Sequence, residues 1–138
     1  MKYFLFIFFF LVLNPITSDM YLGKWRLTGG SIIEIYRNED VFEGRVIQRS
    51  VFPLYNRDGL DGKNPKINLR KRAIVGLIIL NDLYFKEGEL LGGSIYNSDT
   101  GKTYKVKLLI DENNTDVCHV EIFNDNEKKD FKIKRVLD

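Results

Sequence analysis

The stretch Thr103-Tyr104-Lys105-Val106-Lys107-Leu108-Leu109-Ile110 decides the fold class, because apolar side chains recur at every second position along it. In an extended chain these apolar residues share one face while the two lysines share the other. This period of two is typical of a β-strand with one buried face. A polar turn lies on each side of the strand, at 98–101 and at 111–115, so the sequence predicts a hairpin at both ends.

The same pattern recurs along the rest of the chain, where stretches of β-branched and aromatic residues alternate with turn residues and almost nothing has helical period. We expect strands at 23–28, 31–37, 41–49, 74–81, 90–97, 103–110, 116–123 and 131–136. The nearly continuous aliphatic stretch 74–81 predicts a strand covered on both faces. About eight strands with short hairpins predict an all-β domain, either an antiparallel sandwich or an up-and-down barrel, whose closure would leave no exposed edge.

One connection is much longer than the others and spans about residues 50–73. Asn64 as N-cap and Pro65 at the first helical position predict a single helical turn through Arg70. Long connections without regular structure are uncommon in compact domains, and they are usually functional or mobile. We therefore keep two interpretations open, a lid over one end of a barrel and a disordered excursion.

The first residues fit a secretory signal peptide. Lys2 is followed by eleven consecutive apolar residues, 3–13, and then by the segment 14–18, which contains Pro15 and ends at Ser18. A spanning helix needs about 20 apolar residues, so we expect no membrane span in the mature form. The sequence predicts a signal peptide at 1–18, a single domain at 19–138, and a periplasmic or secreted protein. An uncleaved anchor and a buried core segment are the alternatives.

The composition limits the function. The chain has 138 residues with 21 basic and 19 acidic side chains, a net charge of +2. This balance is not that of a dedicated nucleic-acid binder. One cysteine and one histidine are too few for a disulfide framework or a Cys/His-rich metal site, so we expect no metal and no cofactor.

The only cysteine and the only histidine are neighbours, Cys118 and His119, in an expected strand. Adjacent strand residues point to opposite faces, so the two cannot form a nucleophile–base pair. We expect a buried Cys118 thiol and an exposed His119. The sequence thus predicts no enzyme, although a hydrolase built on carboxylates stays open.

Two resemblances add to this interpretation. Gly23-Lys24-Trp25 resembles the Gly-x-Trp signature of lipocalin and fatty-acid-binding barrels, in which an arginine of the last strand packs across the tryptophan; Arg135 has that place here. Nearly all of residues 20–137 resemble the bacterial family called domain of unknown function 2147. The matching motifs are 23–25, 31–36, 44–47, 64–65, 69–72, 76–80, 92–97 and 101–104. This resemblance implies export and a lipocalin-like barrel, and it implies no activity.

The interior of the barrel is the candidate binding site. An eight-stranded barrel is about wide enough to fill itself or to hold one small ligand. The alternation predicts that these candidate ligand-binding residues point inward: Phe42, Val46, Tyr104, Val106, Leu108 and Val120. We expect the ligand to be a small hydrophobic or amphipathic molecule. The alternative is an envelope or extracellular protein–protein interaction module whose barrel is filled; the oligomeric state stays open.

The long connection is rich in positive charge. Five cations occur without an acid between residues 63 and 72: Lys63, Lys66, Arg70, Lys71 and Arg72. They fit either a solvated loop or a cationic rim that attracts an anionic ligand. In the second case we expect Arg70 or Arg72 to meet the negative head of a ligand held in the barrel.

Overall fold

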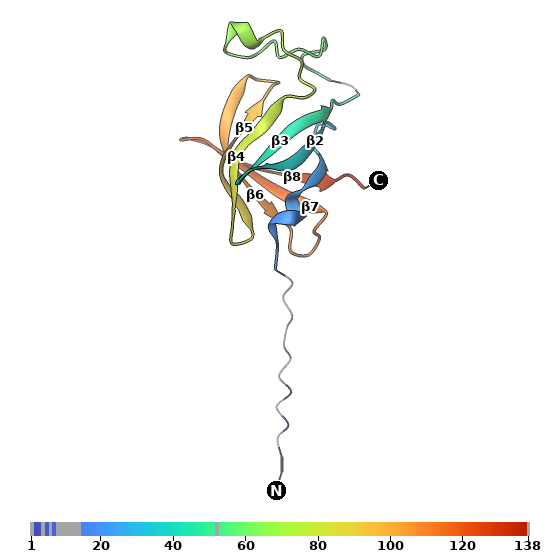
Figure 1. Cartoon of the computed structure of the whole chain (residues 1–138), viewed down its shortest axis with the longest axis vertical. Coiled ribbons are helices and arrows are strands. Elements are labelled where there is room, and N and C mark those ends of the chain that lie inside the picture. Colours follow the sequence, from blue (N-terminus) through green and yellow to red (C-terminus); the bar gives the residue numbers. More distant parts are fainter. Residues whose placement is uncertain (1, 4, 6, 8–14, 52, 138) are drawn as a thin grey trace.

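The computed structural model describes residues 2–3, 5, 7, 15–51 and 53–137, and within them eight antiparallel strands form one closed barrel (Figure 1). Consecutive strands pair with each other, and β8 returns to pair with β1. The prediction of an all-β up-and-down barrel is confirmed. The strands are β1 (Gly23–Arg26), β2 (Ile32–Asn38), β3 (Val41–Gln48), β4 (Ile78–Lys86), β5 (Glu89–Asn97), β6 (Lys102–Ile110), β7 (Val117–Phe123) and β8 (Lys128–Arg135).

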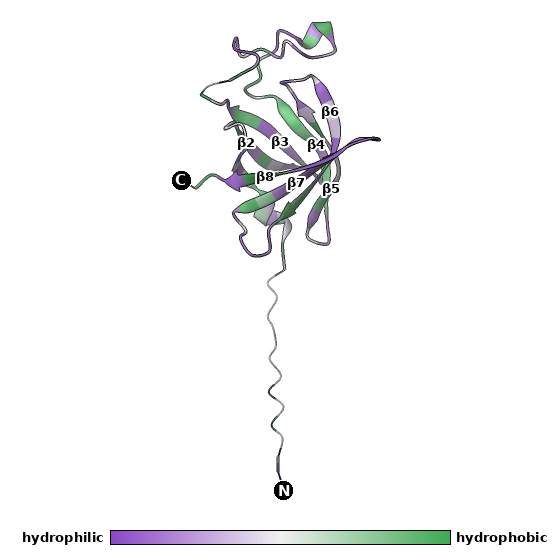
Figure 2. Cartoon of the chain, turned by 180° about the vertical axis from the view of Figure 1, so that it is seen from behind, coloured by the Kyte–Doolittle hydropathy of each residue, from purple (hydrophilic) through white to green (hydrophobic). Residues whose placement is uncertain are grey.

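The two ends of the barrel differ. A short 3-10 helix, η1 (Ser18–Tyr21), lies at one end, and the long connection between β3 and β4 lies at the other (Figure 1). Apolar and polar residues alternate along the strands, as Figure 2 shows, because each strand has one face toward the interior and one toward solvent. The part of residues 1–18 that includes 1, 4, 6 and 8–14 lies outside the described residues, so the signal peptide stays a prediction.

The η1 end of the barrel is closed by packed and hydrogen-bonded side chains. Tyr21 and Trp25 are both fully buried, and the Trp25 indole N–H donates to the Tyr21 carbonyl at 2.9 Å. The Tyr21 hydroxyl donates to the Gly88 carbonyl at 2.6 Å. The Arg135 guanidinium lies 4.3 Å from the centre of the Trp25 ring and donates to the carbonyl of Leu22 at 3.1 Å. The arginine–tryptophan contact that the Gly-x-Trp resemblance implies is therefore present.

The fourth strand does not follow the sequence prediction. β4 begins at Ile78, because Ile74–Leu77 form a turn in which the Leu77 N–H donates to the Ile74 carbonyl at 3.0 Å. Gly76 has a φ of 92°, which only glycine adopts readily and which ends the extended chain there. Val75 and Ile78 are 51% and 40% exposed. The strand predicted at 74–81 is thus present only from Ile78 onward, and the exposure of Ile78 contradicts the expectation that both faces are covered.

The paired glycines of the 92–97 motif have a packing role. A Cβ on Gly93 would lie 2.3 Å from the carbonyl oxygen of Asn81, and one on Gly92 would lie 2.3 Å from the Tyr84 ring. Opposite them, Asp82 has a φ of 59°, and Leu83 is fully buried. β4 and β5 can approach this closely only because residues 92 and 93 have no side chain.

Candidate functional site

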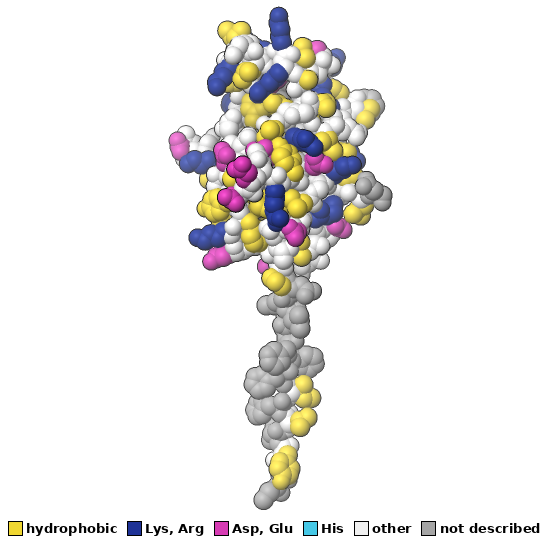
Figure 3. All heavy atoms as spheres, in the orientation of Figure 1, with side chains coloured by type: hydrophobic (Ala, Val, Ile, Leu, Met, Phe, Trp, Pro, Cys, Tyr) yellow, Lys and Arg dark blue, Asp and Glu magenta, His cyan; other side chains and the backbone are white. Residues whose placement is uncertain are grey.

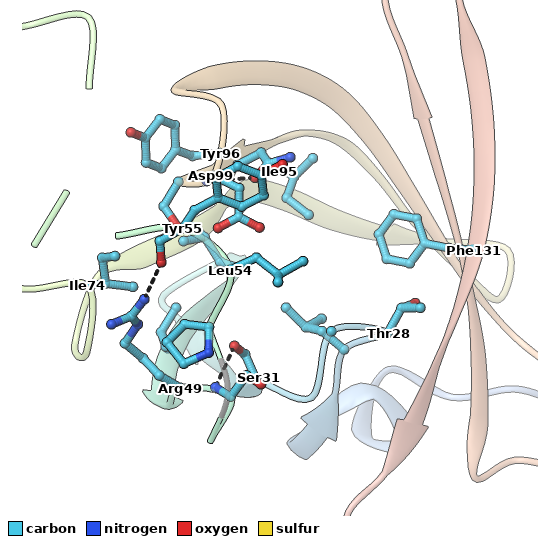
Figure 4. Close-up of a pocket in the computed structure, with 18 of the residues that line it drawn as sticks. Thr28, Ser31, Arg49, Leu54, Tyr55, Ile74, Ile95, Tyr96, Asp99 and Phe131 are labelled. Carbon is cyan, nitrogen blue, oxygen red and sulfur yellow. Dashed lines mark hydrogen bonds between the residues drawn. The ribbon is translucent and has the colours of Figure 1, made fainter. Parts of the chain in front are cut away.

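A cavity of about 540 Å³ opens at the end of the barrel opposite Trp25 (Figure 4). Its apolar walls come from residues of several strands and of the segments beside them: Leu27, Val46, Ile79, Ile95, Tyr104, Ile122 and Phe131. Its volume is within the range of about 300–1,000 Å³ that small-molecule sites occupy. The barrel is therefore filled at the Trp25 end and hollow at the other.

The predicted interior residues divide between these two halves. Val46 and Tyr104 line the cavity. The other four strand residues belong to the packed core and do not line it: Phe42, Val106, Leu108 and Val120, which are 4%, 1%, 0% and 3% exposed. All six face inward as the alternation predicts, but their depth along the barrel separates them. Alternation cannot give that depth, because the depth depends on the stagger of neighbouring strands.

The first part of the long connection covers the mouth of the cavity. Pro53, Leu54 and Tyr55 line the cavity from this side, and Leu54 points across it toward Phe131 (Figure 4). The Tyr55 carbonyl accepts a hydrogen bond from Arg49 at 3.1 Å. We call residues 53–55 the lid segment.

Leu54 and Tyr55 are 81% and 47% exposed although they point toward an apolar space. A group of large exposed apolar side chains around a cavity is typical of a binding site rather than of a surface without a binding function.

The rest of the connection folds along the outside of the barrel and is held there by a buried carboxylate. Asp61 is fully buried, and its Oδ1 accepts a hydrogen bond from the Tyr96 hydroxyl at 2.5 Å. Its Oδ2 accepts from Asn64 Nδ2 at 2.9 Å and from Arg72 Nε at 3.0 Å. We call Asp61, Asn64, Arg72 and Tyr96 the Asp61 cluster. Burial, and then the nearby Asp61 carboxylate, raise the pKa of Tyr96 to about 12.

Backbone contacts add to this anchoring. Leu60 and Ala73 form an isolated antiparallel bridge, and Asn56 Nδ2 donates to the carbonyl of Ser98 at 2.8 Å in the β5–β6 turn. A Cβ on Gly101 would lie 2.0 Å from the Lys63 carbonyl, so the connection also lies directly against this turn. The described part of the connection is therefore an anchored structure, and residues 53–55 of it act as a cover.

The predicted helical turn is present in a shorter form. The structure has a 3-10 helix η2 (Ile67–Leu69) with Lys66 at its N-cap position. Asn64 is not the cap, because its Oδ1 accepts the Lys66 N–H at 2.9 Å and its amide is bound to Asp61. An Asn-Pro pair supports such a local turn as readily as a helix start.

The arginines of the connection do not lie beside the barrel cavity, where the hypothesis of a cationic rim places them. Neither Arg70 nor Arg72 lines the barrel cavity. Arg72 is bound to Asp61 with its guanidinium 5.9 Å from the centre of the Tyr96 ring, and Arg70 Nε donates to the Asn64 carbonyl at 2.7 Å. Both side chains are thus bound within the connection and its contact with Tyr96. The cation that does line the cavity is Arg49, which sequence reasoning missed because it lies outside the basic run.

The cysteine and the histidine lie on opposite sides of the barrel wall. Cys118 is fully buried, and burial raises the pKa of its thiol to about 12. His119 Nε2 lies 2.9 Å from Asp111 Oδ2 near the surface. Among the described residues no group of three His, Cys, Asp or Glu is placed to hold a metal ion, and no described helix is long and apolar enough to cross a membrane.

Residues 23–121 match the family described as "uncharacterized protein conserved in bacteria (DUF2147)". The chain belongs to this family. Among solved structures, the chain is similar to protein HP1028 from Helicobacter pylori, whose title assigns that protein to the lipocalin family. The two share 24% sequence identity with a TM-score of 0.73, over 86% of this chain and 84% of that one. This likeness shows that the two proteins share a fold. No curated protein matches the chain.

Proposed function

We propose that this protein is an exported binding protein that carries a small apolar or amphipathic molecule in the cavity beneath the lid segment. The observation that supports this most is the cavity of about 540 Å³ with mainly aliphatic and aromatic walls. Burying an apolar ligand in such a space removes both the ligand and the wall from water, at roughly 25 cal/mol for each Å² of apolar surface. Export rests on the apolar leader of residues 3–13.

The lining of the cavity also includes polar and charged groups. Arg49, Ser31 and Asp99 are among them (Figure 4). A ligand with an apolar body and a polar end would therefore enter body first and leave its polar end near these groups. The Arg49 guanidinium, held by the Tyr55 carbonyl, favours a carboxylate at that position. The Asp99 carboxylate favours a positively charged group instead. The preferred charge of the ligand's polar end therefore depends on whether that end lies beside Arg49 or beside Asp99.

We propose a binding role rather than catalysis. The Cys118 thiol is buried outside the cavity lining and is kept protonated, and the His119 ring is bound to Asp111 on the outer surface. The Tyr96 hydroxyl, which lies in the cavity lining, donates to the Asp61 carboxylate, and its raised pKa makes it a poor nucleophile.

The proposal is tested by titrating the purified protein with straight-chain fatty acids and the matching alcohols by calorimetry. We expect binding that is abolished by Ile95→Phe, since Ile95 lines the cavity and a larger ring there removes ligand volume. Val75→Phe is the matched control, because Val75 is exposed and lines neither the cavity nor the barrel core.

Two further variants identify the polar end of the ligand. Arg49→Gln weakens the fatty acid more than the alcohol if the carboxylate meets Arg49, whereas Asp99→Asn strengthens it. Equal binding by Ile95→Phe and the unchanged protein would contradict the proposal. Absence of any binding would favour the alternative, a module that acts through its outer surface.

A further inference from the structure

A second hollow lies on the outside of the barrel, between the long connection and strands β4, β5 and β6. It measures about 420 Å³ and shares with the barrel cavity only the residue Tyr96. The connection contributes Lys66 and Arg72, and the strands contribute Asn81, Ser94 and Thr103. We call this hollow the outer groove.

Four of the five strand residues that line the outer groove are polar and lie beside one another. Asn81 and Ser94 are direct partners in the β4–β5 pairing, and Tyr96 and Thr103 are partners in the β5–β6 pairing. Ser94 and Tyr96 are two positions apart on β5 and so share its outer face. Besides the Tyr96 hydroxyl, which is bound to Asp61, two hydroxyls and an amide thus lie side by side on three strands, and their small side chains leave the space open.

The groove is lined by two cations and by no carboxylate. Arg72 uses its Nε for Asp61, which leaves the two terminal nitrogens of its guanidinium without a hydrogen-bond partner among the described residues. The surrounding segment, 62–81, contains five cations and no acid. Figure 3 shows basic side chains over the connection, at the top of that view. The lining of the groove itself has two cations and no carboxylate, which favours an anionic ligand.

Cations beside hydroxyl and amide donors form the donor set that recognises a tetrahedral oxyanion. Arginine offers paired N–H groups to phosphate oxygens, lysine adds a point charge, and hydroxyls complete the shell. Leu69 and Ile78 add an apolar edge to the groove. From this geometry we infer that the outer groove binds a phosphate monoester, its phosphate held by Lys66, Arg72, Ser94 and Thr103 and its carbon part against Leu69 and Ile78.

The test is a titration of the isotope-labelled protein with glycerol 3-phosphate and with inorganic phosphate, followed by amide NMR shifts at about 0.15 M salt. We expect saturable shifts at Ser94 and Thr103, with tighter binding of the ester. Lys66→Ala should weaken binding by about tenfold or more, as expected for loss of a hydrogen bond to a charged group. Lys71→Ala is the matched control and should change the affinity by less than about twofold, because Lys71 is exposed, does not line the groove, and its charge is screened by salt.

Thr103→Val provides a second variant that keeps the shape and removes a donor, and it too should weaken binding. Arg72 is left unchanged because its loss would also release Asp61. Ile95→Phe, which fills the barrel cavity, should leave phosphate binding intact, so this inference and the proposed function can fail separately. No saturable shift, or equal losses in Lys66→Ala and Lys71→Ala, would overturn the inference.

Discussion

Replacing Asp61 by asparagine should detach the long connection from the barrel. The carboxylate is fully buried and accepts hydrogen bonds from Tyr96, Asn64 and Arg72. An asparagine has the same shape but carries no charge, and it turns an NH₂ group toward at least one of these donors. A buried donor facing a donor is left unsatisfied, which costs more than the lost hydrogen bond alone.

The magnitude follows from these contacts. Hydrogen bonds to a charged group contribute about 1.5–3 kcal/mol, and leaving a buried donor unsatisfied costs about 1–3 kcal/mol. The Arg72 side chain is 38% exposed, so its ion pair with Asp61 is screened and adds little. We therefore expect Asp61→Asn to lower the free energy of unfolding by about 2–4 kcal/mol. Tyr96→Phe removes one of the three hydrogen bonds, and we expect a loss of about 1–2 kcal/mol.

Urea unfolding measures the total loss, and amide hydrogen exchange shows where it falls. We expect faster exchange in residues 53–76 and unchanged exchange in β6 and β7, because the barrel itself keeps its contacts. Asp58→Asn is the control, since Asp58 is exposed and an asparagine can still accept the Leu60 N–H. An Asp61→Asn protein as stable as the control, with unchanged exchange in the connection, would refute the role of the Asp61 cluster as an anchor.

Three further predictions follow from other parts of the fold. Gly93→Ala should destabilise the barrel by about 1–3 kcal/mol in urea unfolding because its Cβ would meet Asn81, whereas Gly29→Ala, with no atom within 4 Å, should be neutral. Arg135→Lys keeps the charge but loses the contact with the Trp25 ring and the hydrogen bond to the Leu22 carbonyl, so we expect a lower melting temperature. The hydrogen bond from His119 holds the pKa of Asp111 below its usual value. Its stabilising effect is therefore fully present above the usual pKa of an aspartate and is lost as the pH falls through the lowered pKa, and His119→Ala should raise this pKa in a carboxyl NMR titration.

Much of the fold could be predicted from the sequence because strand alternation reflects burial directly. The strand at 103–110 and its flanking turns agree with β6 and its neighbours, and Trp25 and Arg135 meet as the Gly-x-Trp signature implies. The error at 74–81 has a physical cause, since an aliphatic run shows that residues are apolar but not where the extended conformation begins. The left-handed Gly76 decides that point.

The candidate site could be predicted from the sequence only in part. Alternation identifies side chains that face the interior, but it cannot separate the packed half near Leu108 from the hollow half near Tyr104. Arg70 and Arg72 were expected at the mouth because they are basic and lie in the long connection. The sequence contains one sign that part of the positive charge of residues 63–72 is balanced within the fold. Asp61 is the last acid before these basic residues, and it forms an ion pair with Arg72.

Native mass spectrometry of the protein, purified without detergent from an exporting host, shows whether the barrel cavity carries a small molecule. We expect a reproducible mass excess that disappears on denaturation and is absent from Ile95→Phe, and extraction would then identify the class of the carried molecule. A bare protein mass, both as purified and after incubation with a mixture of lipids and fatty acids, would contradict a binding function for the barrel cavity.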